Sequence, residues 1–118
     1  MEETLISIIV VSYNAEKTVL DTLDSVLTQT YRNIELVISD DCSKDNTVSV
    51  IEGWMAAHKN DISGGIKLLT IQKNTGVCAN LNRAVLASTG EWIKIIAADD
   101  KLLPNCCTDY MMFVQNNK

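Results

Sequence analysis

The chain has 118 residues, of which 47% are hydrophobic and 21% are charged, and its formal net charge is −5. This length suits one domain, or part of one, and is enough to bury a core. The hydrophobic fraction is ordinary for a globular protein and argues against a disordered chain. The ten basic residues stand singly rather than in a cluster. A protein that recognises nucleic acid usually carries a basic face, so we expect no nucleic-acid partner.

The sequence also indicates where such a chain would work. No stretch approaches the ~20 apolar residues of a membrane-spanning helix. The start, Met1-Glu2-Glu3, lacks the basic region of a signal peptide. The four cysteines match no zinc-binding spacing and suit free thiols in a reducing compartment. We expect no membrane segment in this chain and a cytoplasmic location, or one peripheral to the inner face of the membrane in a full-length parent.

Apolar, β-branched runs alternate with segments of helical periodicity. In chain order, the predicted elements are strand 5–11, helix 16–28, strand 34–39, a helix capped by 45–47 that runs to 58, strand 66–71, helix 77–88, strand 91–97 and helix 106–115. Leu81, Val85 and Leu86 mark the expected apolar side of the third helix. The alternation predicts an α/β fold with a Rossmann-like, mostly parallel sheet, helices on both faces and right-handed crossovers.

Polar residues follow three of the predicted strands. Ser12-Tyr13-Asn14 follows the first, Asp40-Asp41 the second and Asp99-Asp100 the fourth. Ligands bind at the carboxyl ends of the strands in open α/β sheets. We therefore expect these three groups at one edge of the sheet, where they would form a site.

The adjacent carboxylates of Asp99 and Asp100 repel each other, and partial burial would strengthen the repulsion. A divalent cation removes this conflict, and Mg²⁺ typically joins one or two carboxylates to the phosphates of a substrate. The alternative interpretation is that an Asp caps the turn after the strand.

Tyr13 and Asp41 suit a nucleotide base. An aromatic ring after the first strand offers a stacking face worth ~1–3 kcal/mol per base, although it could equally be a lid over the sheet edge. A carboxylate only accepts hydrogen bonds, so Asp41 suits the imide of uracil or the donor edge of guanine, unless it caps the next turn. A base site, a ribose and a metal-bound diphosphate together form a nucleotide-sugar site, in which the metal helps the nucleotide leave. The glycine-rich motifs that bind dinucleotides or ATP phosphates are absent.

Five segments in succession resemble family 2 glycosyltransferases: 6–14, 25–31, 35–47, Asn74-Thr75-Gly76 with Asn82, and 90–93 continuing into 98–100. The resemblance implies a GT-A fold and inverting transfer of a sugar from a nucleotide-diphosphate donor, most often a UDP-sugar, with Mg²⁺ or Mn²⁺. It implies a saccharide or lipid-linked acceptor and a bacterial surface-polysaccharide enzyme. The implied donor-binding residues are Ser12, Tyr13, Asn14, Asp41, Asn82 and Asp99, and the implied metal ligands are Asp99 and Asp100.

The chain departs from the family pattern at four positions. Ala97 replaces a third aspartate, and Leu81 replaces an arginine that would support diphosphate contacts. Val11 replaces a proline and Cys42 replaces a glycine. None of these changes removes Asp41 or the Asp99-Asp100 pair.

Family members extend well beyond this length, and their acceptor-binding half and catalytic base follow the metal motif. After Asp100 the only acid is Asp109, on a helix expected to lead away from the site, so no base is assigned. We expect residues 1–118 to be a donor-binding part, truncated before the acceptor half, that binds donor without turnover. Met111, Met112 and Phe113 would leave an exposed helix suited to a homodimer. The alternatives are a nucleotidyltransferase and a non-catalytic nucleotide-binding or interaction domain on the same fold.

Overall fold

The computed structural model describes residues 4–116, so the acidic start Met1-Glu2-Glu3 lies outside the described residues. Each of the eight predicted elements is present, with bounds that differ from prediction by at most three residues. The elements are β1 (Ile6–Ser12), α1 (Val19–Leu27), β2 (Ile34–Asp40), α2 (Thr47–His58), β3 (Ile66–Leu69), α3 (Val77–Ala87), β4 (Trp92–Ala97) and α4 (Cys106–Asn116). The largest difference is at α1, which begins three residues late.

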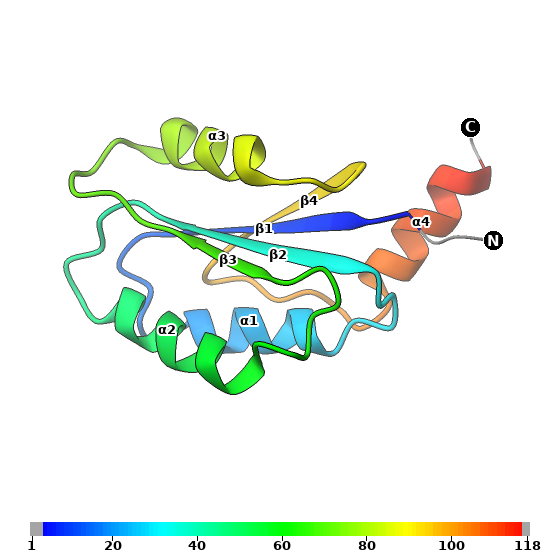
Figure 1. Cartoon of the computed structure of the whole chain (residues 1–118), viewed down its shortest axis with the longest axis horizontal. Coiled ribbons are helices and arrows are strands. Elements are labelled where there is room, and N and C mark those ends of the chain that lie inside the picture. The colour runs from blue at the N-terminus through cyan, green and yellow to red at the C-terminus, as the bar shows by residue number, and fades with distance from the viewer. Residues whose placement is uncertain (1–3, 117–118) are drawn as a thin grey trace.

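The four strands form one parallel sheet in the order β3-β2-β1-β4. Helices α1 and α2 cover one face and α3 covers the other (Figure 1). This confirms the predicted α/β fold with helices on both faces. The register pairs Ser12 with Asp40 and Val11 with Ala97, so β1, β2 and β4 end at the same level. The carboxyl ends of these three strands therefore lie side by side.

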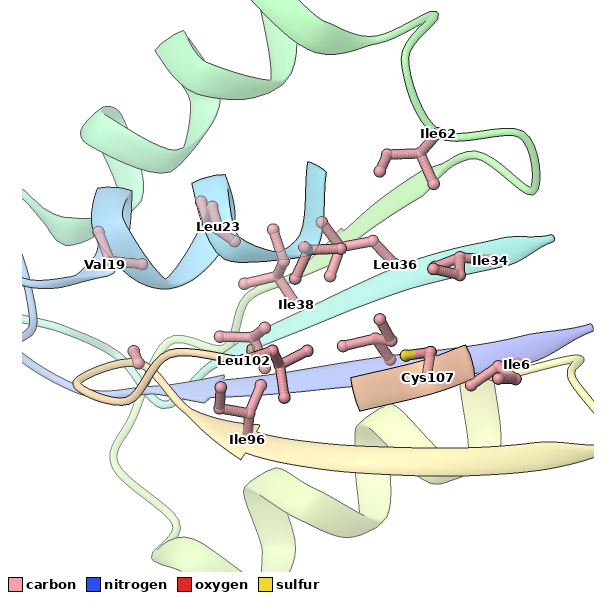
Figure 2. Close-up of a cluster of buried hydrophobic side chains, with 14 of the residues drawn as sticks. Ile6, Val19, Leu23, Ile34, Leu36, Ile38, Ile62, Ile96, Leu102 and Cys107 are labelled. Carbon is pink, nitrogen blue, oxygen red and sulfur yellow. The ribbon is translucent and has the colours of Figure 1, made fainter. Parts of the chain in front are cut away.

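The main core lies between the sheet and helices α1, α2 and α4 (Figure 2). Alternate residues of β1 and β2 face this core, because successive side chains of a strand point to opposite faces. Ile8 and Leu36 are among them and are fully buried. The described helices are all too short or too polar to cross a membrane.

The opposite face of the sheet, under α3, is more polar. Its apolar cluster is small and centres on Ile9, Val37 and Ala84. Ser39 is buried beside them and donates a hydrogen bond of 2.6 Å to Asn80 of α3. The expected apolar side of α3 is therefore wrong in part, because Leu86 is 86% exposed. The helix instead turns Asn80 and Ala84 toward the sheet, where Asn80 binds the sheet's polar groups.

Helix α4 lies at the end of the sheet away from the carboxyl ends of the strands (Figure 1). Met111 is buried there, contrary to the expectation that it lacks cover, because it packs into the main core. Met112 and Phe113 are exposed, at 57% and 66%. A homodimer through this helix stays a prediction.

Candidate functional site

A cavity of about 640 Å³ opens at the carboxyl ends of β1, β2 and β4. It lies where the strand order reverses, since β1 leads to β2 on one side and has β4 on the other. Ligands of open α/β sheets bind at such a reversal. The predicted donor residues that line the cavity are Ser12, Tyr13, Asn14, Asp41 and Asp99.

Two predicted residues lie outside the walls of this cavity. Asn82 is exposed on α3, whereas Asn80, two positions earlier, lines the cavity and is buried. Asp100 is exposed next to Asp99, just beyond the wall. Asn74 and Gly76, from the loop that precedes α3, complete the wall on that side.

Hydrogen bonds hold the loop after β1 against the loop after β2. Asn14 adopts a left-handed backbone conformation with φ of 51°, and its Oδ1 accepts the Lys44 N–H at 2.8 Å. Its own N–H donates to Ser43 Oγ, also at 2.8 Å. Ser12 Oγ donates to Asp40 Oδ1 at 2.7 Å. The side chains of Ser12 and Asn14 therefore shape the cavity, and Tyr13, 44% exposed, is left at its lip.

Asp41 is buried in the cavity wall and is surrounded by donors. Its Oδ1 accepts the Thr75 N–H at 2.9 Å, Thr75 Oγ1–H at 2.6 Å and Arg83 Nη2–H at 3.0 Å. Its Oδ2 accepts the Gly76 N–H at 2.8 Å and shares the Thr75 N–H at 3.1 Å. Burial raises the pKa of Asp41, but the hydrogen bonds from Thr75, Gly76 and Arg83 outweigh it and lower the pKa to about 2. Asp41 is thus an anionic acceptor at neutral pH.

Arg83 and Asn80 are functional candidates that our sequence analysis did not identify. Asn80 Nδ2 donates to the carbonyls of Ser39 at 3.0 Å and Ser12 at 3.4 Å, which joins α3 to the ends of β1 and β2. Arg83 forms an ion pair with Asp41. The sequence held a signal for Asn80. Asn80 stands four residues before Ala84 and so shares its face of the helix, and a polar residue on a buried helix face needs hydrogen-bond partners.

Asp99 and Asp100 are both exposed, so burial does not strengthen the repulsion between their carboxylates. The reason is local, because the turn at Ala98 and Asp99 extends beyond the end of β4. Within residues 4–116, neither carboxylate has a hydrogen bond or ion pair. That part of the chain also holds no cluster of three acidic, histidine or cysteine side chains suited to a metal. Two free carboxylates fit a hard cation that takes its other oxygen ligands from phosphates and water.

Comparison with known protein families gives one match over most of the chain. The sequence model of the family described as "Glycosyl transferase family 2" matches residues 7–118. The chain is 37% identical over 105 residues to the UDP-Glc:alpha-D-GlcNAc-diphosphoundecaprenol beta-1,3-glucosyltransferase WfgD of Escherichia coli, covering 89% of this chain and 39% of that protein. It is 30% identical over 101 residues to the glycosyltransferase GlyG of Streptococcus pneumoniae, covering 86% and 32%. The chain thus spans about two fifths, or less, of these curated relatives.

Solved structures with the same fold include nucleotide-sugar complexes. TarS residues 1–349 of S. aureus in complex with UDP-GlcNAc superposes with a TM-score of 0.83 and 27% identity, covering 94% of this chain and 31% of that one. The mannosyltransferase PcManGT of Pyrobaculum calidifontis in complex with GDP-Man and Mn²⁺ gives a TM-score of 0.78 and 31% identity, covering 87% and 29%.

Proposed function

Because this chain belongs to glycosyltransferase family 2, we propose that its cavity binds the nucleoside diphosphate sugar whose sugar is transferred to an acceptor hydroxyl. The observation that carries the proposal is the convergence of Tyr13, Asp41 and Asp99, from three separate strand ends, on one cavity. Each of the three suits a different part of the donor. The aromatic ring of Tyr13 suits the face of a base, the buried acceptor Asp41 suits the hydrogen-bonding edge of that base, and the exposed carboxylate of Asp99 suits a cation.

The base would lie between Tyr13 and Asp41. Tyr13 would stack on it, and the ionised Asp41 would accept a hydrogen bond from its imide N–H. Uracil offers one such donor, and guanine offers a comparable donor edge. We propose uracil, supported by the UDP-GlcNAc complex of TarS and by the UDP-Glc in the name of WfgD. Asn82 is left out of the proposed contacts, because it is exposed and outside the cavity.

The diphosphate would be bound through a divalent cation held by Asp99 and Asp100. Both side chains are free to bind it, and the Mn²⁺ in the PcManGT complex supports a cation in this fold. When bound, the cation supplies Lewis-acid chemistry that stabilises the charge on the departing nucleoside diphosphate. We propose Mg²⁺ or Mn²⁺, since both prefer oxygen ligands.

Transfer needs a base as well as a donor site. Among the described residues, the acids that line the cavity are Asp41 and Asp99, and both already have other roles here. Asp109 is on α4, at the other end of the sheet (Figure 1). We therefore propose that residues 1–118 bind donor without turnover. Inverting transfer to a saccharide or lipid-linked acceptor would need the rest of a chain as long as the relatives, working in the cytoplasm or at the inner face of the membrane.

Calorimetric titration of the chain with UDP, in the presence and absence of Mn²⁺, tests the proposal. We expect UDP to bind at millimolar concentration or below with Mn²⁺, and a chelator to abolish binding. ADP is the matched control, since it carries the same diphosphate but adenine has no imide N–H. Tighter binding of GDP than of UDP would change the assigned base. Absence of UDP binding, UDP binding that a chelator leaves unchanged, or equal binding of UDP and ADP in the presence of Mn²⁺ would contradict the proposal.

A further inference from the structure

We propose that Arg83 is the positioning residue of the base site, holding Asp41 from behind the cavity wall so that Asp41 Oδ2 accepts the imide N–H of the base. This inference rests on the proposed donor site and adds a residue to it. Arg83 is not itself a wall residue of the cavity, so it would act on the nucleotide only through Asp41.

The guanidinium reaches three side chains at once. Arg83 Nη2 donates to Asp41 Oδ1 at 3.0 Å and to Asn80 Oδ1 at 3.1 Å, and Nη1 donates to Thr75 Oγ1 at 2.8 Å. Thr75 in turn donates its hydroxyl to the same Asp41 oxygen. Because guanidinium is planar and its donors have a fixed spacing, these contacts fix the orientation of the carboxylate as well as its charge.

The two oxygens of Asp41 accept different numbers of hydrogen bonds. Oδ1 accepts three hydrogen bonds, two of which come from the side chains of Arg83 and Thr75. Oδ2 has the Gly76 N–H to itself and shares only the longer contact to the Thr75 N–H. Oδ2 is therefore the less crowded of the two oxygens, and the better placed to accept a further hydrogen bond from the base. Without Arg83, Oδ1 loses one of its three hydrogen bonds, so the carboxylate is held less firmly and the difference between its oxygens becomes smaller.

The surroundings of Arg83 favour a role in the site. Arg83 also lines a shallow, open groove with Leu68, Leu69 and Leu86, and no charged partner for the guanidinium lines that groove. Its Nε is buried and has no hydrogen-bond partner among residues 4–116. Such an unpaired buried donor costs free energy, which makes this arginine a poor choice for stability alone.

The test compares two ligands that differ only at the imide. UDP and N3-methyl-UDP carry the same ribose and diphosphate, but only UDP can donate to Asp41. With Mn²⁺ present, we expect the wild-type chain to bind UDP about tenfold or more tightly than N3-methyl-UDP. We expect Arg83→Met to reduce this ratio to less than about threefold, while a chelator still abolishes UDP binding. Arg32→Met is the matched control, because Arg32 is exposed and, among residues 4–116, its side chain donates to backbone carbonyls only, such as those of Leu27 and Asp61.

Thr75→Val is the second variant, should Arg83→Met fail to fold by circular dichroism. It removes the hydroxyl that links Arg83 to Asp41, and we expect it to lower the ratio in the same direction. A wild-type ratio in Arg83→Met, or in Thr75→Val where that variant alone folds, would overturn the positioning role and leave the donor site intact. A wild-type chain that binds both ligands equally would overturn it as well. A wild-type chain that binds neither would refute the donor site itself.

Discussion

Lys67 Nζ lies 2.9 Å from Oε1 of Glu35, a carboxylate buried at the end of the sheet opposite to the cavity. Ser7 and Thr89 also donate hydrogen bonds to Glu35, and Gly90 N–H donates to Ser7 Oγ at 2.8 Å. This network joins β1, β2 and β3 to the turn before β4. The network has no part in the proposed chemistry, so we expect substitutions in it to change the free energy of unfolding and not ligand binding.

The ionised form of Glu35 should stabilise the fold above pH 4.5. Burial raises its pKa, but the hydrogen bonds from Ser7, Thr89 and Lys67 outweigh it and lower the pKa from 4.5 to about 2. Since the folded value is the lower one, this stability is lost as pH falls from 4.5 toward 2. We expect Glu35→Gln to lower the free energy of unfolding by about 1–3 kcal/mol at neutral pH, and the difference from wild type to shrink below pH 4.5. Urea unfolding across this pH range checks it, and a constant difference would contradict it.

Gly90 should tolerate no side chain. A Cβ at this position would lie 2.5 Å from Ser7 Oγ and 2.6 Å from Ser7 N. We expect Gly90→Ala to lower the free energy of unfolding by about 1–3 kcal/mol or more, because backbone has to move. Gly53→Ala is the matched control, since the same Cβ in α2 would meet nothing within 4 Å. That change should stabilise the chain by about 0.5–1 kcal/mol through helix propensity. Thermal unfolding of both variants measures the two changes in stability. A Gly90→Ala variant as stable as wild type would contradict the close approach of Gly90 to Ser7.

Asp99 and Asp100 should matter for binding and not for folding. We expect Asp99→Asn and Asp100→Asn to leave the free energy of unfolding within about 0.5 kcal/mol of wild type, because both side chains are exposed and unpaired among residues 4–116. Each should weaken UDP binding in Mn²⁺ at least about tenfold, by loss of a metal ligand. Asp109→Asn, on the distant α4, is the control. A loss of about 0.5–2 kcal/mol of stability with binding intact would instead support a capping role.

Tyr13 should contribute through its ring. We expect Tyr13→Ala to weaken UDP binding by ~1–3 kcal/mol and Tyr13→Phe to retain most of it, since stacking needs only the aromatic face. Binding of inorganic pyrophosphate with Mn²⁺ should be the same in all three proteins. Calorimetry with the two ligands makes the comparison. An equal loss of pyrophosphate binding in Tyr13→Ala would point to a lid over the sheet edge rather than a base platform.

Much of this architecture could be predicted from periodicity and strand ends. The apolar runs gave the four strands, and polar residues directly after them gave Tyr13, Asp41 and Asp99, which the parallel topology then brings to one edge. This step succeeds because a parallel strand always delivers its following residue to the same edge of the sheet.

Side-chain pairing across elements was beyond the sequence. The contact of Arg83 with Asp41 joins residues 42 positions apart, and nothing in local spacing specifies it. The buried side of α3 was also misjudged, since Leu86 fits an apolar helix face by composition but Asn80 is needed against the sheet. The exposure of Asp99 and Asp100 depends on how far a turn extends past its strand, which apolar patterning does not encode.

Glu35 and Asp41 belong to the same stretch of chain, six residues apart and thus separated by roughly 20 Å. Substitutions at such a distance, with no shared partners, combine additively. Substitutions that change ligand preference around Asp41 and substitutions that raise the free energy of unfolding around Glu35 can therefore be selected in separate libraries. The selected substitutions can then be combined without screening every pair.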